Sequence, residues 1–487
     1  MTPKLPKDFS GQFKLTPLGG QLADASNYLE LGAFCLSWVS PSRAVRVVEK
    51  SGRTVGALFG LPVDYLNKKV VIDDLLCETN ISEVGIDRFV EDSIYRLSGS
   101  FLFVLDCSEG RRVYLDADGT MSAVWESEKH SVAATAGLLL DAAEYADRFD
   151  EELYRYLDVK KEGWFPAGLT AHHGVHRILV NHYLDLETWT QHRHWPQSQI
   201  PTSSDPEGTC RQIADITRAT IDTLRRSGTV SLTLTAGNET RLLLACCKDF
   251  FDDLEFVTVV GQETRLDAVR AKELAKKFGL KHRLLDIVYA DADGQEDWHA
   301  RTGHCLGGVN MKSYPSVLPM SERSFFLIGL GGEIGRAFFW NSGDAPGVDL
   351  TVESISRRMG MPEHKRVLDA IEAWRPSIDG FDVFLQLDLA YLELRMGCWA
   401  YAQAYSHPKV MEISPMICRE VFAHMLSLPP EWRRQNRVIL EPIEQIWPQL
   451  LELPINEYGD YRDYVRKIGR AVRNPHIVMS KLRKLRG

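Results

Sequence analysis

The segment TVSLTLTAGNETR, residues 229–241, decides the fold class because a strand pattern runs directly into a turn of small and hydroxylated residues. We read the strands of this region as continuous apolar and β-branched runs, which are typical of strands covered on both faces. Further runs lie at 254–260, 281–287 and 324–330, and the helical stretch RLDAVRAKELAKKFG (265–279) separates the first two. This alternation predicts an α/β doubly wound parallel sheet.

The chain before this region carries short strand patterns separated by turns. Expected strands cover 33–39, 44–50, 100–107, 111–117 and 131–135, with helical stretches at 84–97 and 136–157. They predict an α+β sandwich. The Pro-, Ser-, Asp- and Gly-rich connection at about 187–206 predicts a boundary between domains 1–200 and 201–487. From about 350 onward a helical C-terminal part is expected, with helices at 366–374, 383–405, 416–426 and 437–451.

Composition and charge indicate a globular chain and argue against nucleic-acid binding. Of the 487 residues 44% are apolar and 25% charged, and the net charge is −9. Residues 462–487 hold nine Lys or Arg residues against the acid Asp463, so this tail carries +8 and the remainder −17. An acidic body lacks the basic surface that nucleic-acid binding needs. We interpret the tail as an amphipathic helix packed on the body, with closure over a nucleotide or docking to a partner as alternatives.

Nine cysteines occur without a CxxC pair, which predicts reduced thiols. Among them, Cys246 and Cys247 are expected to be small core residues. The N-terminus has no signal-peptide core, and no stretch of about 18 apolar residues occurs. We therefore expect a cytoplasmic protein that does not interact with membranes, and the sequence leaves its oligomeric state open.

Two Gly-rich turns, each directly after a strand, form the candidate ligand site. Open parallel sheets bind ligands at their carboxyl edge, where small residues let backbone N–H groups approach an anion at a helix start. The residues expected to contact ATP or its phosphates are Thr235, Ala236, Gly237, Asn238, Thr240, Val260, Gly261, Gly329, Gly331 and Gly332. The two turns also carry one carboxylate each, Glu239 and Glu333, which suit Mg²⁺ bridging a polyphosphate.

The same residues exclude two common nucleotide motifs. The lysine of a Walker A loop is missing, and Ile334 stands where GxGxxG has its last glycine. A plain strand-to-helix turn, whose glutamate only favours the helix dipole, explains the residues equally well.

The order of the motifs resembles the asparagine synthetase family. Residues 235–241 resemble its SGGxDS loop, 257–282 its next strand, Asp267, helix and His282, and 329–335 its GxGxDE loop. Further likenesses are 97–126 to its glutaminase fold, 174–195 to its inter-domain segment and 413–433 to its PFLDxxLVE…LPxxxR stretch. The resemblance covers about 95–455 and implies an N-terminal-nucleophile-type sandwich joined to an ATP pyrophosphatase domain.

The resemblance implies ATP and Mg²⁺ as cofactors and a two-step reaction. In that family a carboxylate attacks the α-phosphate of ATP, pyrophosphate leaves, and an amine or ammonia displaces AMP to form an amide. This chain has Thr2 and Pro3 where the family exposes a cysteine after Met1, so we expect no glutamine hydrolysis. Glu239 and Glu333 replace aspartates, and Leu330 stands where asparagine synthetases carry Glu and β-lactam synthetases Tyr. The resemblance therefore specifies neither product.

Two further groups of side chains outside the turns are candidates for a functional role. Tyr391, Glu393 and Arg395 belong to a dense aromatic and charged cluster, which favours core packing with a buried ion pair, with an acceptor-substrate pocket as the alternative. Two histidine pairs, His172–His173 and His192 with His194, lack partners at zinc-ligand spacing and are interpreted as surface residues.

The sequence thus predicts an ATP- and Mg²⁺-dependent ligase that adenylates a small-molecule or peptide carboxylate and transfers it to an amine or ammonia. Cyclases of the β-lactam and lasso-peptide kind are its nearest functional analogues within the family. A non-catalytic pseudoenzyme or partner-binding protein is the alternative, and ammonia-dependent asparagine or sugar-acid amidation is another.

Overall fold

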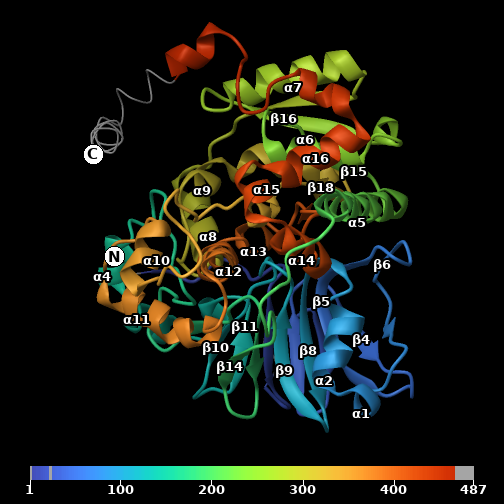
Figure 1. Cartoon of the computed structure of the whole chain (residues 1–487). Helices are drawn as coiled ribbons and strands as arrows, with labels where there is room; N and C mark the ends of the chain where they lie inside the picture. Colours follow the sequence, from blue (N-terminus) through green and yellow to red (C-terminus); the bar gives the residue numbers. More distant parts are fainter. Residues whose placement is uncertain (1–2, 21–24, 467–487) are drawn as a thin grey trace.

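The computed structural model describes residues 3–20 and 25–466 and shows a mixed α/β protein. Two largely antiparallel sheets pack face to face, and a separate five-stranded sheet is parallel throughout. In Figure 1 the antiparallel strands β4, β5, β8 and β9 lie below, and β15, β16 and β18 of the parallel sheet lie above. The predicted combination of a sandwich-like part and a parallel sheet with flanking helices is confirmed.

The antiparallel part consists of two sheets with a shared core. The first runs in the order β12 (His176–Arg177), β10 (Val124–Glu126), β11 (Ser131–Ala133), β1 (Phe13–Pro17), β3 (Phe34–Trp38) and β2 (Asn27–Glu30). The second runs β14 (Thr190–Arg193), β13 (His182–Asp185), β9 (Gly110–Leu115), β8 (Ser98–Cys107), β5 (Thr54–Asp64), β4 (Ala44–Val48) and β7 (Leu75–Leu76), with β6 (Lys69–Val70) beside β5. Phe13 and Leu36 of the first sheet and Phe59 and Leu102 of the second bury one another in this core. The outer face of the second sheet is covered by α1 (Ile81–Val84), α2 (Ile86–Phe89) and η1 (Val90–Ile94).

The parallel sheet has the order β17 (His282–Asp286), β16 (Glu255–Val260), β15 (Val230–Thr233), β18 (Phe325–Leu327) and β19 (Glu412–Ile413). The helix before it, α5 (Pro206–Ser227), begins where Asp205 accepts a hydrogen bond from the Gly208 N–H and proline occupies the first turn. The remaining helices around the sheet are α6 (Asn238–Cys246), α7 (Arg265–Phe278), α8 (Ala292–Arg301), α9 (Val309–Ser313), η4 (Tyr314–Glu322), α14 (Arg419–Ser427), α15 (Pro430–Arg434) and α16 (Arg437–Ile446). Elements that complete the chain are η2 (Ala136–Leu138), α3 (Ala142–Asp147), α4 (Glu151–Tyr156), η3 (Phe251–Asp253), η5 (Gly332–Gly335), α10 (Val352–Arg358), α11 (Lys365–Trp374), η6 (Arg375–Ile378), α12 (Val383–Leu389), η7 (Ala390–Arg395), η8 (Met396–Cys398), α13 (Ala402–Ser406) and η9 (Pro448–Glu452).

Several boundaries differ from the sequence prediction. The predicted helix 383–405 is divided into α12, a π-helical η7, η8 and α13. The longest strand, β5, was missed because Gly56, Gly60 and Pro62 interrupt its pattern. The two glycines are needed there, since a side chain at Gly60 would meet the Ser100 carbonyl oxygen at 2.5 Å and one at Gly56 would collide with that of Val104.

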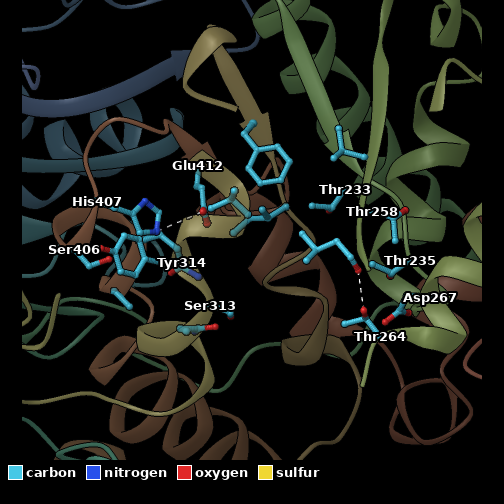
Figure 2. Close-up of a pocket in the computed structure, with 18 of the residues that line it drawn as sticks. Thr233, Thr235, Thr258, Thr264, Asp267, Ser313, Tyr314, Ser406, His407 and Glu412 are labelled. Atoms are coloured by element: carbon cyan, nitrogen blue, oxygen red, sulfur yellow. Dashed lines mark hydrogen bonds and ion pairs between the residues drawn. The ribbon is translucent and has the colours of Figure 1, made fainter. Parts of the chain in front are cut away.

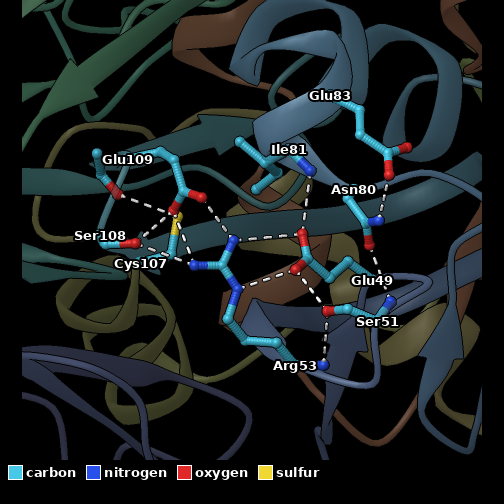
Figure 3. Close-up of polar contacts among 10 residues, drawn as sticks. Glu49, Ser51, Arg53, Asn80, Ile81, Glu83, Cys107, Ser108 and Glu109 are labelled. Atoms are coloured by element: carbon cyan, nitrogen blue, oxygen red, sulfur yellow. Dashed lines mark hydrogen bonds and ion pairs between the residues drawn. The ribbon is translucent and has the colours of Figure 1, made fainter.

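An ion-pair network closes the outer end of the β4–β5 hairpin (Figure 3). Arg53 donates to Glu49 at 2.9 Å and to Glu109 at 2.7 Å, and Glu49 also accepts the Ile81 N–H at the start of α1. Burial alone would raise the pKa of Glu49, but the hydrogen bonds from Arg53 and Ile81 outweigh it and lower the pKa. The network therefore ties the hairpin to the β8–β9 turn and to the covering helices.

Buried arginines connect the antiparallel part with the segments after residue 290. Arg193 of β14 pairs with Glu393 of η7 at 2.6 Å, and Arg177 donates to the Tyr401 hydroxyl at 3.0 Å. Arg301 at the end of α8 binds the Asp8 carboxylate. Because these contacts cross between the two parts, the division at residue 200 remains a prediction.

The histidine interpretation was half wrong. His173 and His192 are exposed, but His172 is buried against the Tyr145 ring with centroids 4.0 Å apart, and His194 stacks on Tyr95. The basic tail lies outside the described residues from 467 onward. Within the described residues, no helix has the length and apolar character needed to cross a bilayer.

We predict that His172 makes the protein sensitive to acid. Burial lowers the pKa of His172 to about 3. Below about pH 6.5, His172 therefore binds a proton in the unfolded chain but not in the folded protein. Stability should therefore fall from pH 6.5 towards pH 4.5, by up to about 1.4 kcal/mol per pH unit for this residue. In His172→Phe, chemical denaturation across this range should show a shallower fall, whereas exposed His192→Gln should match the wild type. Equal slopes in all three proteins would contradict the prediction.

Candidate active site

The two predicted turns meet at the carboxyl edge of the parallel sheet. Because β15 and β18 are parallel neighbours, the segments that follow them leave the sheet on the same side. A Cβ added to Gly329 would lie 2.8 Å from Cβ of Glu239, and one added to Gly332 would lie 2.8 Å from its Cγ. The glycines of the second turn therefore make room for the Glu239 side chain of the first.

Hydrogen bonds shape the first turn. Thr235 Oγ1 accepts the Gly237 N–H at 3.1 Å and lies 2.7 Å from Thr240 Oγ1. The Ala236 N–H donates to Asp267 at 2.8 Å, and the Ala236 carbonyl accepts the Asn456 N–H at 2.8 Å. These contacts place the turn at the N-terminus of α6, where helix N–H groups and the helix dipole favour an anion.

The remaining predicted phosphate residues lie close by. Asn238 is the first residue of α6, and its side chain accepts a hydrogen bond from Asn436 at 2.9 Å. Val260 ends β16, and the Gly261 N–H donates to Thr264 Oγ1 at 2.7 Å. Gly331 has a φ of +95°, a left-handed conformation that favours glycine. The fold thus gathers the ends of β15, β16 and β18 at one edge.

The two predicted metal carboxylates lie within electrostatic reach of each other. Burial raises the pKa of Glu239 to about 7, the negative charge of Glu333 adds to the rise, and Arg336 opposes it. Arg336 also forms an ion pair with Glu239, and Glu333 accepts the Gly331 N–H at 3.2 Å. Sequence reasoning missed the role of Arg336, because nothing in its spacing shows that it folds back onto the other turn.

The carboxylate pair fits Mg²⁺ held jointly with phosphate. Residues 3–20 and 25–466 contain no group of three or more His, Cys, Asp or Glu side chains suited to a metal ion. Mg²⁺ at nucleotide sites needs only one or two carboxylates, since phosphate oxygens and water complete its octahedron. Glu239 and Glu333 would hold the ion, provided that Arg336 exchanges Glu239 for a phosphate.

A pocket of about 250 Å³ runs from these turns along one face of the sheet (Figure 2). Thr235, Thr264 and Asp267 lie at one end, and Ser406, His407 and Glu412 lie at the opposite end, which we call the inner end. Val257, Val259, Phe326 and Ile328 of the strands supply apolar walls. No sequence signal pointed to the inner end, which forms only because β19 and the end of α13 meet there.

The predicted substrate residues separate into two environments. Tyr391 packs on Phe338 with ring centroids 4.7 Å apart, and burial, together with the charge of Glu333, raises its pKa. Arg395 lies over the Trp164 ring at 5.0 Å. Glu393 is fully buried, and its carboxylate accepts hydrogen bonds from Arg193, Asn181 and Trp374. Tyr391 is thus the member of this trio within electrostatic reach of the carboxylate pair.

No protein-family model matches this chain, and no curated protein matches it.

We predict that removing the Glu239 charge stabilises the protein at alkaline pH. The folded pKa of about 7 exceeds the ordinary value of 4.5, so the folded state binds more protons in this window and stability falls as pH rises through it. Relative to the wild type, Glu239→Gln should gain about 1–3 kcal/mol between pH 5 and pH 8. Chemical denaturation at both pH values measures this gain. The exposed Glu263→Gln, in the loop after β16, serves as the control, and an equal response of both variants would refute the raised pKa.

Proposed function

We propose that the protein is an ATP- and Mg²⁺-dependent ligase that forms an amide from a carboxylate and an amine without hydrolysing glutamine. The observation that carries the proposal is the meeting of Glu239 and Glu333 beside the N-terminus of α6, in and next to a turn whose Thr235 lines a pocket. Burial and the negative charge of Glu333 raise the proton affinity of Glu239, an arrangement that a bound cation would relieve.

The charges of the site suit a polyphosphate. The start of α6 offers N–H groups and only a fraction of a positive charge, and Arg336 adds a full one. Mg²⁺, when bound, would neutralise the remaining phosphate charge and stabilise the leaving pyrophosphate. Arg336 would leave Glu239 as the nucleotide enters and bind a phosphate oxygen instead, which frees Glu239 for the ion.

The proposed chemistry has two balanced steps. A substrate carboxylate oxygen attacks the α-phosphorus of ATP, and pyrophosphate leaves. An amine or ammonia nitrogen then attacks the acyl carbon, loses a proton, and AMP leaves with the former carboxylate oxygen. The pocket gives a place for the substrate next to the phosphate-binding turns. Small-molecule or peptide carboxylates and amines are the partners, and asparagine or sugar-acid amidation with ammonia is the narrower form of the same proposal.

We also infer a more specific fold class for each of the two parts. The two antiparallel sheets would form an N-terminal-nucleophile-type sandwich, and the sheet order β17-β16-β15-β18-β19 supports a doubly wound ATP pyrophosphatase domain. The position that would carry the glutaminase nucleophile, Thr2, lies outside the described residues.

A non-catalytic pseudoenzyme is the second candidate, and two observations favour it. The ion pair with Arg336 already compensates the charge of Glu239, one of the two proposed metal ligands. Leu330 is buried and has an apolar side chain, which offers no functional group to a substrate. ATP-dependent pyrophosphate release separates the two candidates.

We expect Glu239→Gln and Glu333→Gln to abolish the Mg²⁺ dependence of ATP binding. Each change removes one metal-binding oxygen charge while keeping the side-chain shape, so pyrophosphate release should fall at least about a hundredfold, or roughly 3 kcal/mol. Calorimetric titration of ATP with and without Mg²⁺, followed by a pyrophosphate assay with a panel of carboxylates and amines, measures both effects. Glu263→Gln serves as the control. A wild-type protein that binds no ATP at millimolar concentration would leave only the pseudoenzyme.

A further inference from the structure

The inner end of the pocket contains polar groups without partners. Ser406 Oγ and His407 Nδ1 are buried, and neither has a hydrogen-bond partner among the described residues. Their residues are 5% and 8% exposed, so bulk water does not satisfy these atoms. Leaving a buried polar group unsatisfied costs about 1–3 kcal/mol. Two such groups side by side in a pocket wall therefore indicate a polar partner that enters the pocket.

Glu412 adds a buried carboxyl to the same end. Its side chain is 7% exposed, and His407 Nε2 lies 3.8 Å from its Oε1 (Figure 2). Burial lowers the pKa of His407 to about 4, so this imidazole is neutral at physiological pH and supplies no charge. Burial likewise raises the pKa of Glu412 to about 8. Among the described residues no Lys or Arg nitrogen lies within 4.0 Å of this carboxyl to supply the positive charge that a buried carboxylate needs.

The charge of the pocket has one sign. Among the described residues that line it, Asp267 and Glu412 are acidic, and none is Lys or Arg. On its other side Glu412 borders a second cavity of about 610 Å³, whose wall includes Arg43, Lys68, Lys69 and Arg226. None of these bases forms an ion pair with Glu412, whose ion-pair partner among the described residues is His407. Ser406 and His407 line the first pocket, and their partner must come from there.

We propose that Ser406, His407 and Glu412 bind a primary ammonium group at the far end of a substrate whose reacting group lies at the two Gly-rich turns. An ammonium offers three donors, and the carboxylate of Glu412, a ring nitrogen of His407 and the hydroxyl oxygen of Ser406 are acceptors. Charge-assisted hydrogen bonds of this kind are the strong ones. The apolar walls formed by Val317, Phe326 and Ile328 suit an aliphatic stem.

The length of the pocket defines the substrate class. Glu412 pairs with Phe326 across the sheet and Phe326 pairs with Ser231, whereas Thr235 lies four residues further along the chain. Four residues at about 3.3 Å along the strand and two strand spacings of about 4.8 Å across the sheet place the Cα atoms of the two ends roughly 16 Å apart. A volume of about 250 Å³ over this length admits a thin molecule. An unbranched amino acid with a terminal amine, its carboxylate at the turns, has the required form.

This assignment rests on the proposed function only for the orientation of the substrate, because ammonium binding can be measured without ATP. The probes are 6-aminohexanoate, 6-hydroxyhexanoate and hexanoate, which share a stem and a carboxylate and differ at the far end. Calorimetry on the full-length wild type should show 6-aminohexanoate binding at least about tenfold more tightly than either other probe. Glu412→Gln, which keeps the shape and removes the charge, should abolish this preference, and Glu263→Gln should retain it.

A pH series supplies a readout that a structural role of Glu412 would not change. The titratable and charged groups around Glu412 are the neutral His407, Tyr314, which stacks on the His407 ring, and Asp267 at the opposite end of the pocket. The second cavity adds the basic residues Arg43, Lys68, Lys69 and Arg226. Because the Glu412 carboxylate fraction rises through about pH 8, binding of 6-aminohexanoate should strengthen from pH 6.5 to 8.5 in the wild type and stay constant in Glu412→Gln.

Each outcome decides the proposal. Equal affinities for the three probes, no binding of 6-aminohexanoate at millimolar concentration, or an undiminished preference in Glu412→Gln would overturn it and indicate ordered water at these atoms instead. ATP binding without ammonium binding refutes this inference alone, whereas ammonium binding without ATP binding refutes the proposed function alone.

Discussion

Arg301 is the residue on which the arrangement of the molecule depends most directly. Its guanidinium binds the Asp8 carboxylate and carbonyl in the N-terminal segment, and also the carbonyls of Tyr405 and Ser406 at the end of α13. The side chain is 4% exposed, so its charge would be costly without these acceptors. Three distant parts of the chain must therefore come together before this charge is satisfied.

The consequence reaches the pocket. Because Arg301 binds the Ser406 carbonyl, it fixes the position from which Ser406 and His407 line the inner end. Arg177 acts in the same way one turn earlier, since it binds the hydroxyl of Tyr401. Separation of the sandwich from the later helices would leave several guanidinium groups without partners, so these contacts oppose it.

In the candidate active site, by contrast with Arg301, buried charge is only partly compensated. Burial and the negative charge of Glu333 raise the proton affinity of Glu239, and Arg336 offsets this only in part. Such an arrangement reduces the stability of the folded protein, and in the proposed function a bound Mg²⁺ would offset this cost. At the inner end of the pocket, burial likewise raises the pKa of Glu412.

The sequence by itself determined the two classes of sheet and the two turns, because strand periodicity and glycine-rich junctions are local properties. It also predicted that Glu239 and Glu333 lie at one edge of the sheet, since parallel strands end there, and their metal-binding role remains a prediction. It could not show that Arg336 folds back onto Glu239, that Glu393 forms an ion pair with Arg193, or that His172 is buried. Nor could it join Glu412 to Ser406 and His407. These facts depend on contacts between residues far apart in the chain, and only the tertiary structure decides which side chain satisfies which buried charge.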